Sequence, residues 1–80
     1  MLVRIGNKGT ARKLFREGQV IHLFPCKANI NSPWWNGGVQ ISQKSGDTFD
    51  HLVNAFEYHN CNAETGYYAH YYVERGKNNG

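Results

Sequence analysis

The chain has 80 residues, of which 40% are hydrophobic and 19% are charged. This is enough for one globular domain with a thin core, and it leaves no room for a separate substrate domain. No apolar run approaches the ~20 residues of a membrane span, and polar residues 6–9 interrupt the N-terminal apolar stretch before a signal peptide could form. We therefore expect a cytoplasmic protein without membrane contact, whose two cysteines, Cys26 and Cys61, are reduced; the alternative is a disulfide between them.

The formal net charge of +3 is unevenly distributed. Residues 1–27 carry six basic side chains and one acidic side chain, a net charge of +5. Residues 28–80 carry three basic and five acidic side chains, a net charge of −2. A basic third joined to a mildly acidic remainder predicts a localised surface that faces an anion.

The first half of the chain predicts a strand, a helix and a second strand. Residues 1–5 alternate as a short strand. Thr10 is a candidate N-cap for a helix that runs to about Glu17, because an apolar stripe follows it and Gly18 stands where helices commonly stop. Residues 19–24 are rich in strand-forming side chains.

The second half predicts a strand, a helix and a final strand. Residues 39–43 alternate in polarity, and Asp47 or Thr48 caps a helix that closes at the Asn-rich turn over 60–62. Apolar residues at i, i+3, i+4 and i+7 make this the clearest helical signal in the chain: Phe49, Leu52, Val53 and Phe56. A strand over 67–74 then places two sets of side chains on opposite faces, Tyr67, Ala69, Tyr71 and Val73 against Tyr68, His70, Tyr72 and Glu74.

These elements predict an α+β fold in a single domain over residues 1–74, with a frayed tail over 75–80. We expect a small sandwich in which two helices cover one face of a three- or four-stranded, mainly antiparallel sheet. The order β-α-β-β-α-β is that of a ferredoxin-like sandwich, which is one possible arrangement. The crossover over 6–18 is short for joining parallel strands, so a three-stranded sheet results if the first strand does not form. An exposed sheet edge would allow a homodimer.

The predicted first helix carries the strongest charge pattern in the chain. Lys8, Arg12 and Arg16 are spaced by four residues and form one row, with Lys13 beside it. The preceding loop leads to the helix N-terminus, where backbone N–H groups favour an anion. The row predicts contact with phosphate or a nucleic-acid backbone; the alternative is a solvated face whose long side chains cover the edge of the core.

The loop sequence Gly6-Asn7-Lys8-Gly9 resembles the Gly-x-x-Gly loop of KH domains, which clamps a single-stranded nucleic-acid backbone. The resemblance covers about seven residues around this loop. Arg12 stands where that family has an aliphatic residue, and only five residues precede the loop. We therefore expect phosphate contact from the loop without a KH fold.

Aromatic residues supply two further candidate binding surfaces. Tyr68, His70 and Tyr72 alternate on one face of the last strand, where they could stack bases or pack across strands. Trp34 and Trp35 lie in the long linker over 26–38, with Lys27 at its base. Tryptophan dominates many interfaces, so this linker predicts contact with a protein partner or a base; the alternative is a lid over the core.

No complete catalytic or metal-binding pattern is present. Cys26, His59, Cys61 and His70 can be drawn together as a zinc site, but their spacing matches no common zinc motif. We therefore expect a non-enzymatic binding module without metal or cofactor. Its partner is nucleic acid, through the basic helix face and the exposed aromatic residues, or alternatively a protein, through Trp34 and Trp35.

Overall fold

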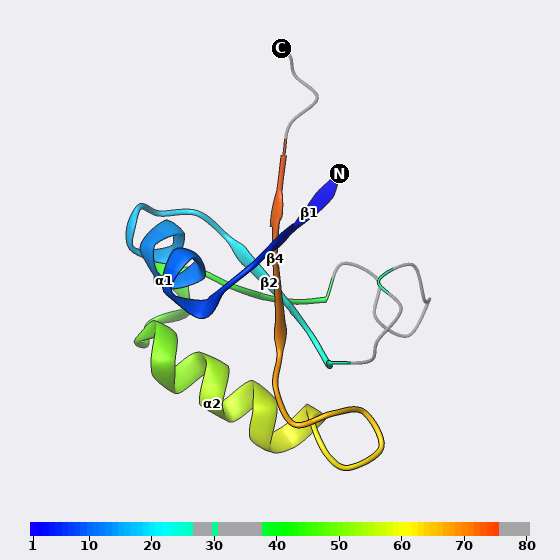
Figure 1. Cartoon of the computed structure of the whole chain (residues 1–80). Coiled ribbons are helices and arrows are strands. Elements are labelled where there is room, and N and C mark those ends of the chain that lie inside the picture. The colour runs from blue at the N-terminus through cyan, green and yellow to red at the C-terminus, as the bar shows by residue number, and fades with distance from the viewer. Residues whose placement is uncertain (27–29, 31–37, 76–80) are drawn as a thin grey trace.

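The computed structural model describes residues 1–26, 30 and 38–75. In these residues the fold is α+β, a four-stranded antiparallel sheet with two α-helices, as the sequence predicts. The elements follow one another along the chain (Figure 1) as β1 (Leu2–Ile5), α1 (Lys8–Arg16), β2 (Ile21–Phe24), β3 (Val39–Ile41), the 3-10 helix η2 (Gln43–Ser45), α2 (Phe49–Asn60) and β4 (His70–Glu74). None of the helices in this part of the chain is long and apolar enough to cross a membrane.

The strand order across the sheet is β1-β4-β2-β3, and each neighbouring pair is antiparallel. The last strand, β4, is therefore inserted between β1 and β2, which run in the same direction and are joined through α1. This order does not confirm the ferredoxin-like arrangement. Among the described strands, β1 and β3 form the two edges of the sheet.

Both helices pack against the same face of the sheet (Figure 1). Their apolar stripes point inward because residues three and four apart share one side of a helix. Phe15 of α1 meets Phe49 of α2 edge-on, with ring centroids 5.5 Å apart. The buried cluster they join is completed from the sheet and from the rest of the helices by Ile5, Ala11, Ile21, Leu23, Ile41, Val53, Phe56, Ala69, Tyr71 and Val73.

Helix α1 begins earlier than the sequence predicts. The N-cap is Asn7 rather than Thr10: the Asn7 side-chain oxygen accepts a hydrogen bond of 2.8 Å from the backbone N–H of Thr10. Asn is as good a cap as Thr, and capping from Asn7 adds a full turn of helix. Lys8 therefore belongs to the first turn. The helix ends before Gly18, whose positive φ of 93° is the left-handed conformation expected after a helix.

The other boundaries differ from the prediction by a few residues. Strand β3 stops at Ile41 because Ser42 caps η2. Thr48, one of the two predicted caps, begins α2. Strand β4 begins at His70, and the Ala69 N–H before it donates to the Glu57 carboxylate at 2.9 Å. Of the predicted tail over 75–80, only Arg75 is described.

Candidate nucleic-acid interface

The basic row of α1 is held against the start of α2 by one carboxylate. Arg12 forms an ion pair of 2.6 Å with Asp50, and the Lys8 ammonium lies 3.9 Å from the same oxygen. The Arg12 guanidinium also stands 5.6 Å from the centroid of the Phe49 ring, within the range of a cation–π contact. The hydrogen bond from Arg12 is the largest cause of the lowered pKa of Asp50; desolvation opposes it, and the charges of the three basic residues add to it. Two of the three charges in the row are thus partly neutralised.

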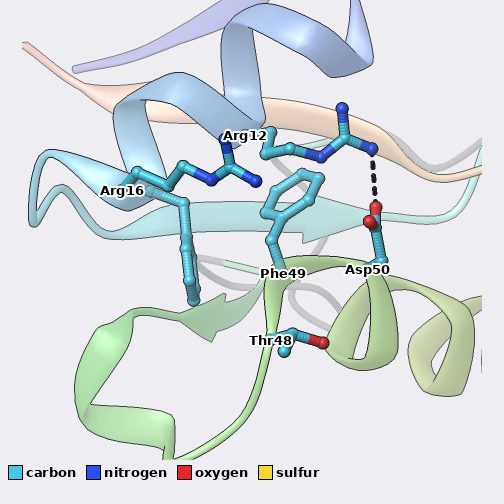
Figure 2. A pocket seen from close by; sticks show the side chains of 6 residues that line it. Arg12, Arg16, Thr48, Phe49 and Asp50 are labelled. Carbon is cyan, nitrogen blue, oxygen red and sulfur yellow. Dashed lines mark hydrogen bonds and ion pairs between the residues drawn. The ribbon is translucent and has the colours of Figure 1, made fainter.

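The C-terminal half of the row has no such partner. Lys13 and Arg16 are exposed, and neither forms an ion pair with another described residue. Figure 2 shows Arg12 and Arg16 along one side of a hollow of about 370 Å³, with Phe49 at its centre and Thr48 and Asp50 opposite. The Arg16 carbonyl accepts a hydrogen bond of 2.8 Å from the Gln43 side chain, which ties this end of α1 to η2.

A second hollow lies at the N-terminus of α1 and joins segments that are far apart in the sequence. It measures about 290 Å³ and is open to solvent. The Gly6-Asn7-Lys8 loop forms one side, and Tyr68 and His70 form the other. Tyr68 is 73% exposed, so its ring is accessible to a ligand. The Gly-x-x-Gly loop and two of the aromatic residues of the last strand, which the sequence singled out separately, therefore meet at this place.

Arg4 and Cys26 also line this N-terminal hollow, and the sequence did not single out Arg4. Strand register explains the position of Arg4, because it pairs with Tyr72 of β4, on the sheet face opposite the helices. His70 is half-buried. Desolvation lowers the pKa of His70, and the Arg4 charge lowers it further. The imidazole is consequently neutral at physiological pH, and the positive charge of the hollow comes from Arg4 and Lys8.

Tyr72 is less accessible than Tyr68. It is half-buried and packs edge-on against Phe24, with ring centroids 5.1 Å apart and an interplanar angle of 76°. Phe24 and His22, its neighbours on β2, are themselves buried. Tyr72 therefore packs across strands in the structure, and Tyr68 offers the more accessible ring.

Three predicted site residues, Lys27, Trp34 and Trp35, lie outside the described residues. The zinc alternative has no counterpart in the described part of the chain, where no group of three or more His, Cys, Asp or Glu side chains could hold a metal ion. Of its four members, Cys26 and His70 are in contact, with the Cys26 sulfur 3.6 Å from His70 Nε2.

Asp50 is the other residue of the candidate site that the sequence-based prediction did not include. Its position in the first turn of α2 is explained locally, because an acidic side chain there complements the helix dipole. Its pairing with α1 depends on how the two helices pack against each other. The periodicity of each helix alone does not reveal that packing.

No protein family, no curated protein and no solved structure matches this chain.

Proposed function

We propose that this protein is a small, non-catalytic, cytoplasmic module that binds nucleic acid through the basic face of α1 and the accessible aromatic residues beside its N-terminus. The proposal is carried by one observation: cationic side chains and an exposed ring line the same N-terminal hollow, namely Arg4, Lys8 and Tyr68. Phosphate needs cations and N–H donors, and a base needs an exposed ring to stack on. Single-stranded nucleic acid supplies both groups, since its bases are free to turn outward.

The rest of the α1 surface extends this basic region. Lys13 and Arg16 are exposed and available to a phosphate backbone that continues along the helix. The Lys8 contact with Asp50 is long at 3.9 Å, and both side chains are largely exposed, so it can be exchanged for a phosphate at little cost. A homodimer through the edge strand β3 is compatible with this surface, because β3 contributes no residue to the N-terminal hollow, whereas β1 contributes Arg4.

Fluorescence anisotropy with labelled oligonucleotides tests the proposal. Single-stranded DNA, single-stranded RNA and duplex DNA are titrated with the full chain at low and at physiological salt. We expect saturable binding that weakens with salt, and a loss of about tenfold or more in the variant Lys13→Glu/Arg16→Glu. Arg75→Glu, which reverses a charge at the far end of β4, is the matched control and should cost much less affinity per charge reversed.

Tyr68→Ala tests the aromatic contribution separately. Stacking on one ring is worth about 1–3 kcal/mol, so affinity should fall roughly fivefold or more. Tyr58→Ala removes a ring that is 84% exposed on α2 and should leave affinity unchanged. Absence of binding at low salt, or equal losses in the two tyrosine variants, would contradict the proposed site. Binding of a protein partner with little salt dependence, lost in Trp34→Ala, would favour the alternative function.

A further inference from the structure

The two cysteines of the sequence are brought together by the fold. Cys26 follows β2, and Cys61 is the C-cap residue of α2; both are free thiols and half-buried. The Cys26 backbone N–H lowers the pKa of the Cys61 thiol as a hydrogen-bond donor would, against the larger effect of burial, which places the two residues within hydrogen-bond reach. Such a hydrogen bond requires contact between the two residues.

The turn that follows Cys61 fixes Cys26 in place. Asn62 and Gly66 form an isolated antiparallel bridge, with the Gly66 N–H donating to the Asn62 carbonyl at 2.7 Å. A Cβ on Gly66 would lie only 2.3 Å from the Cys26 Cβ, so the backbone of this turn rests directly on the Cys26 side chain. The chain therefore packs Cys26 against the segment that carries Cys61.

The two thiols have different surroundings. Cys26 lines the solvent-open N-terminal hollow, where its sulfur lies 3.6 Å from the neutral His70 imidazole, a group able to accept the thiol proton. Cys61 packs against the hydrophobic core. Desolvation raises the pKa of Cys61, and the Glu57 charge raises it further, so this thiol stays protonated at neutral pH. Cys26 is thus the residue that an external reagent reaches first.

We propose that Cys26 and Cys61 form a dithiol site that exchanges with small anionic disulfides, with Cys26 as the attacking thiol and Cys61 as the resolving thiol. The anionic preference follows from Arg4 and Lys8, which line the same hollow as Cys26. The proposal does not depend on nucleic-acid binding.

The exchange is balanced without any further oxidant. His70 takes the Cys26 proton, and the Cys26 thiolate attacks one sulfur of the external disulfide. This forms a mixed disulfide and expels the other half as a thiolate, which takes up a proton. Cys61 then attacks the Cys26 sulfur and gives up its proton to the departing thiolate, so that the second small thiol leaves and the Cys26–Cys61 bond forms. Two electrons pass from the protein to the external disulfide, which is reduced to two thiols.

Glutathione disulfide is the probe, applied to the reduced full chain. We expect both thiols to disappear from a thiol titration and the intact mass to fall by about 2 Da, as for one intramolecular disulfide. Trypsin should then release peptides 17–27 and 45–75 as a linked pair that separates on reduction. With glutathione disulfide in excess, the observed first-order rate constant should be independent of protein concentration.

Single-residue variants assign the two roles. Cys61→Ser should accumulate one glutathionyl group on Cys26. Cys61→Ala is a second variant with the same expected result, for the case that the serine hydroxyl disturbs the core. Cys26→Ser should leave Cys61 reacting at least about tenfold more slowly than Cys26 does in the wild type. His70→Gln should slow the capture of Cys26 by roughly three- to tenfold at neutral pH. Far-ultraviolet circular dichroism checks that each variant is folded.

The charge of the probe tests the role of the hollow. Rates are divided by those of an unstructured reference thiol with the same reagent, and anionic glutathione disulfide should then react faster than cationic cystamine. The proposal is overturned if wild-type protein ends with a glutathionyl group on each cysteine, or if the disulfide links two chains. Equal corrected rates for the two reagents would overturn the anionic preference.

Discussion

At the scale of single residues, Gly66 permits an approach that a side chain would block. Its φ is +100°, and a Cβ would overlap the Cys26 side chain. Gly46 also has a positive φ, of +80°, but a Cβ there meets nothing within 4 Å. A comparison of the same substitution at the two glycines therefore distinguishes the energetic cost of the left-handed backbone from that of the close contact.

Gly66→Ala should consequently destabilise the protein more than Gly46→Ala does. The backbone alone costs about 1 kcal/mol at either position. The overlap with Cys26 should add about 1–3 kcal/mol, because the turn or Cys26 must move. Urea denaturation of the two variants measures the difference in the free energy of unfolding. Equal losses would show that Cys26 moves aside freely.

The buried hydroxyl of Tyr71 predicts a loss of stability in alkali. Tyr71 is 8% exposed in the core. Desolvation raises its pKa to about 12, and Glu57 adds to the effect. The pKa of Tyr71 in the folded protein lies above its ordinary value of 10.0. The contribution of the neutral phenol to folding stability is therefore fully present below pH 10 and is lost as the pH rises toward 12. The loss should reach about 2–3 kcal/mol.

Tyr71→Phe should remove this component of the alkaline loss. The free energy of unfolding, measured between pH 8 and pH 12, should fall less steeply in the variant than in the wild type. Tyr58→Phe is the control, since its ring is 84% exposed. If the free energy of unfolding falls equally steeply with pH in Tyr71→Phe and in the wild type, ionisation of the Tyr71 phenol does not destabilise the folded protein.

At the scale of elements, Asp50 links α2 to the basic row of α1. The pKa of Asp50 is lower in the folded protein than its ordinary value of 3.8. The ion pair with Arg12 therefore stabilises the fold fully above pH 3.8, and this stabilisation is lost as the pH falls through the pKa of the folded protein. Asp50→Asn should therefore show a shallower loss of stability in acid than the wild type, measured by the urea midpoint at neutral pH and near pH 3. The same variant should bind oligonucleotides more tightly, because Lys8 and Arg12 lose their counter-charge.

Asp47→Asn is the control for both measurements. It removes the same charge from an aspartate whose partner is His51 of α2 rather than a residue of α1. If Asp47→Asn raises affinity as much as Asp50→Asn, the gain reflects net charge alone and the Asp50 link does not limit access to the basic row.

The elements that the sequence predicts well are those whose side chains alternate strongly between core and solvent. The stripe of α2 and the shared face of Ala69, Tyr71 and Val73 were predicted from periodicity and are confirmed by burial. Tyr67, predicted on the same face, is 64% exposed because β4 begins only at His70. The start of α1 was predicted late because Asn7 and Thr10 are both good caps, and only the hydrogen-bond geometry distinguishes them.

The candidate site was predicted in parts but not as a whole. Its residues were found separately, since charge rows and aromatic alternation are local patterns. The insertion of β4 between β1 and β2 brings Tyr68 and His70 to the α1 N-terminus, and it also adds Arg4. Strand order depends on non-local pairing, so no local pattern reveals which of these surfaces meet.

At the scale of the whole molecule, the charge asymmetry of the sequence becomes a directional field. The basic side chains of residues 1–16 lie on β1 and α1. The acidic side chains of residues 57–74 are carried by α2, β4 and the segment between them. Glu74 lies beside β1, because it pairs with Leu2, so the positive field that attracts an approaching polyanion is centred on α1.

This field predicts the salt dependence of oligonucleotide binding. If three cations engage phosphates of a single strand, the plot of log affinity against log salt should have a slope of about −2. Lys13→Glu/Arg16→Glu should reduce the magnitude of that slope by about 1.4, because two counterion-releasing contacts are lost. Tyr68→Ala should lower affinity at every salt concentration and leave the slope unchanged, since stacking releases no counterions. Anisotropy titrations across a salt series measure all three slopes, and a changed slope in Tyr68→Ala would mean that its ring positions the phosphate rather than the base.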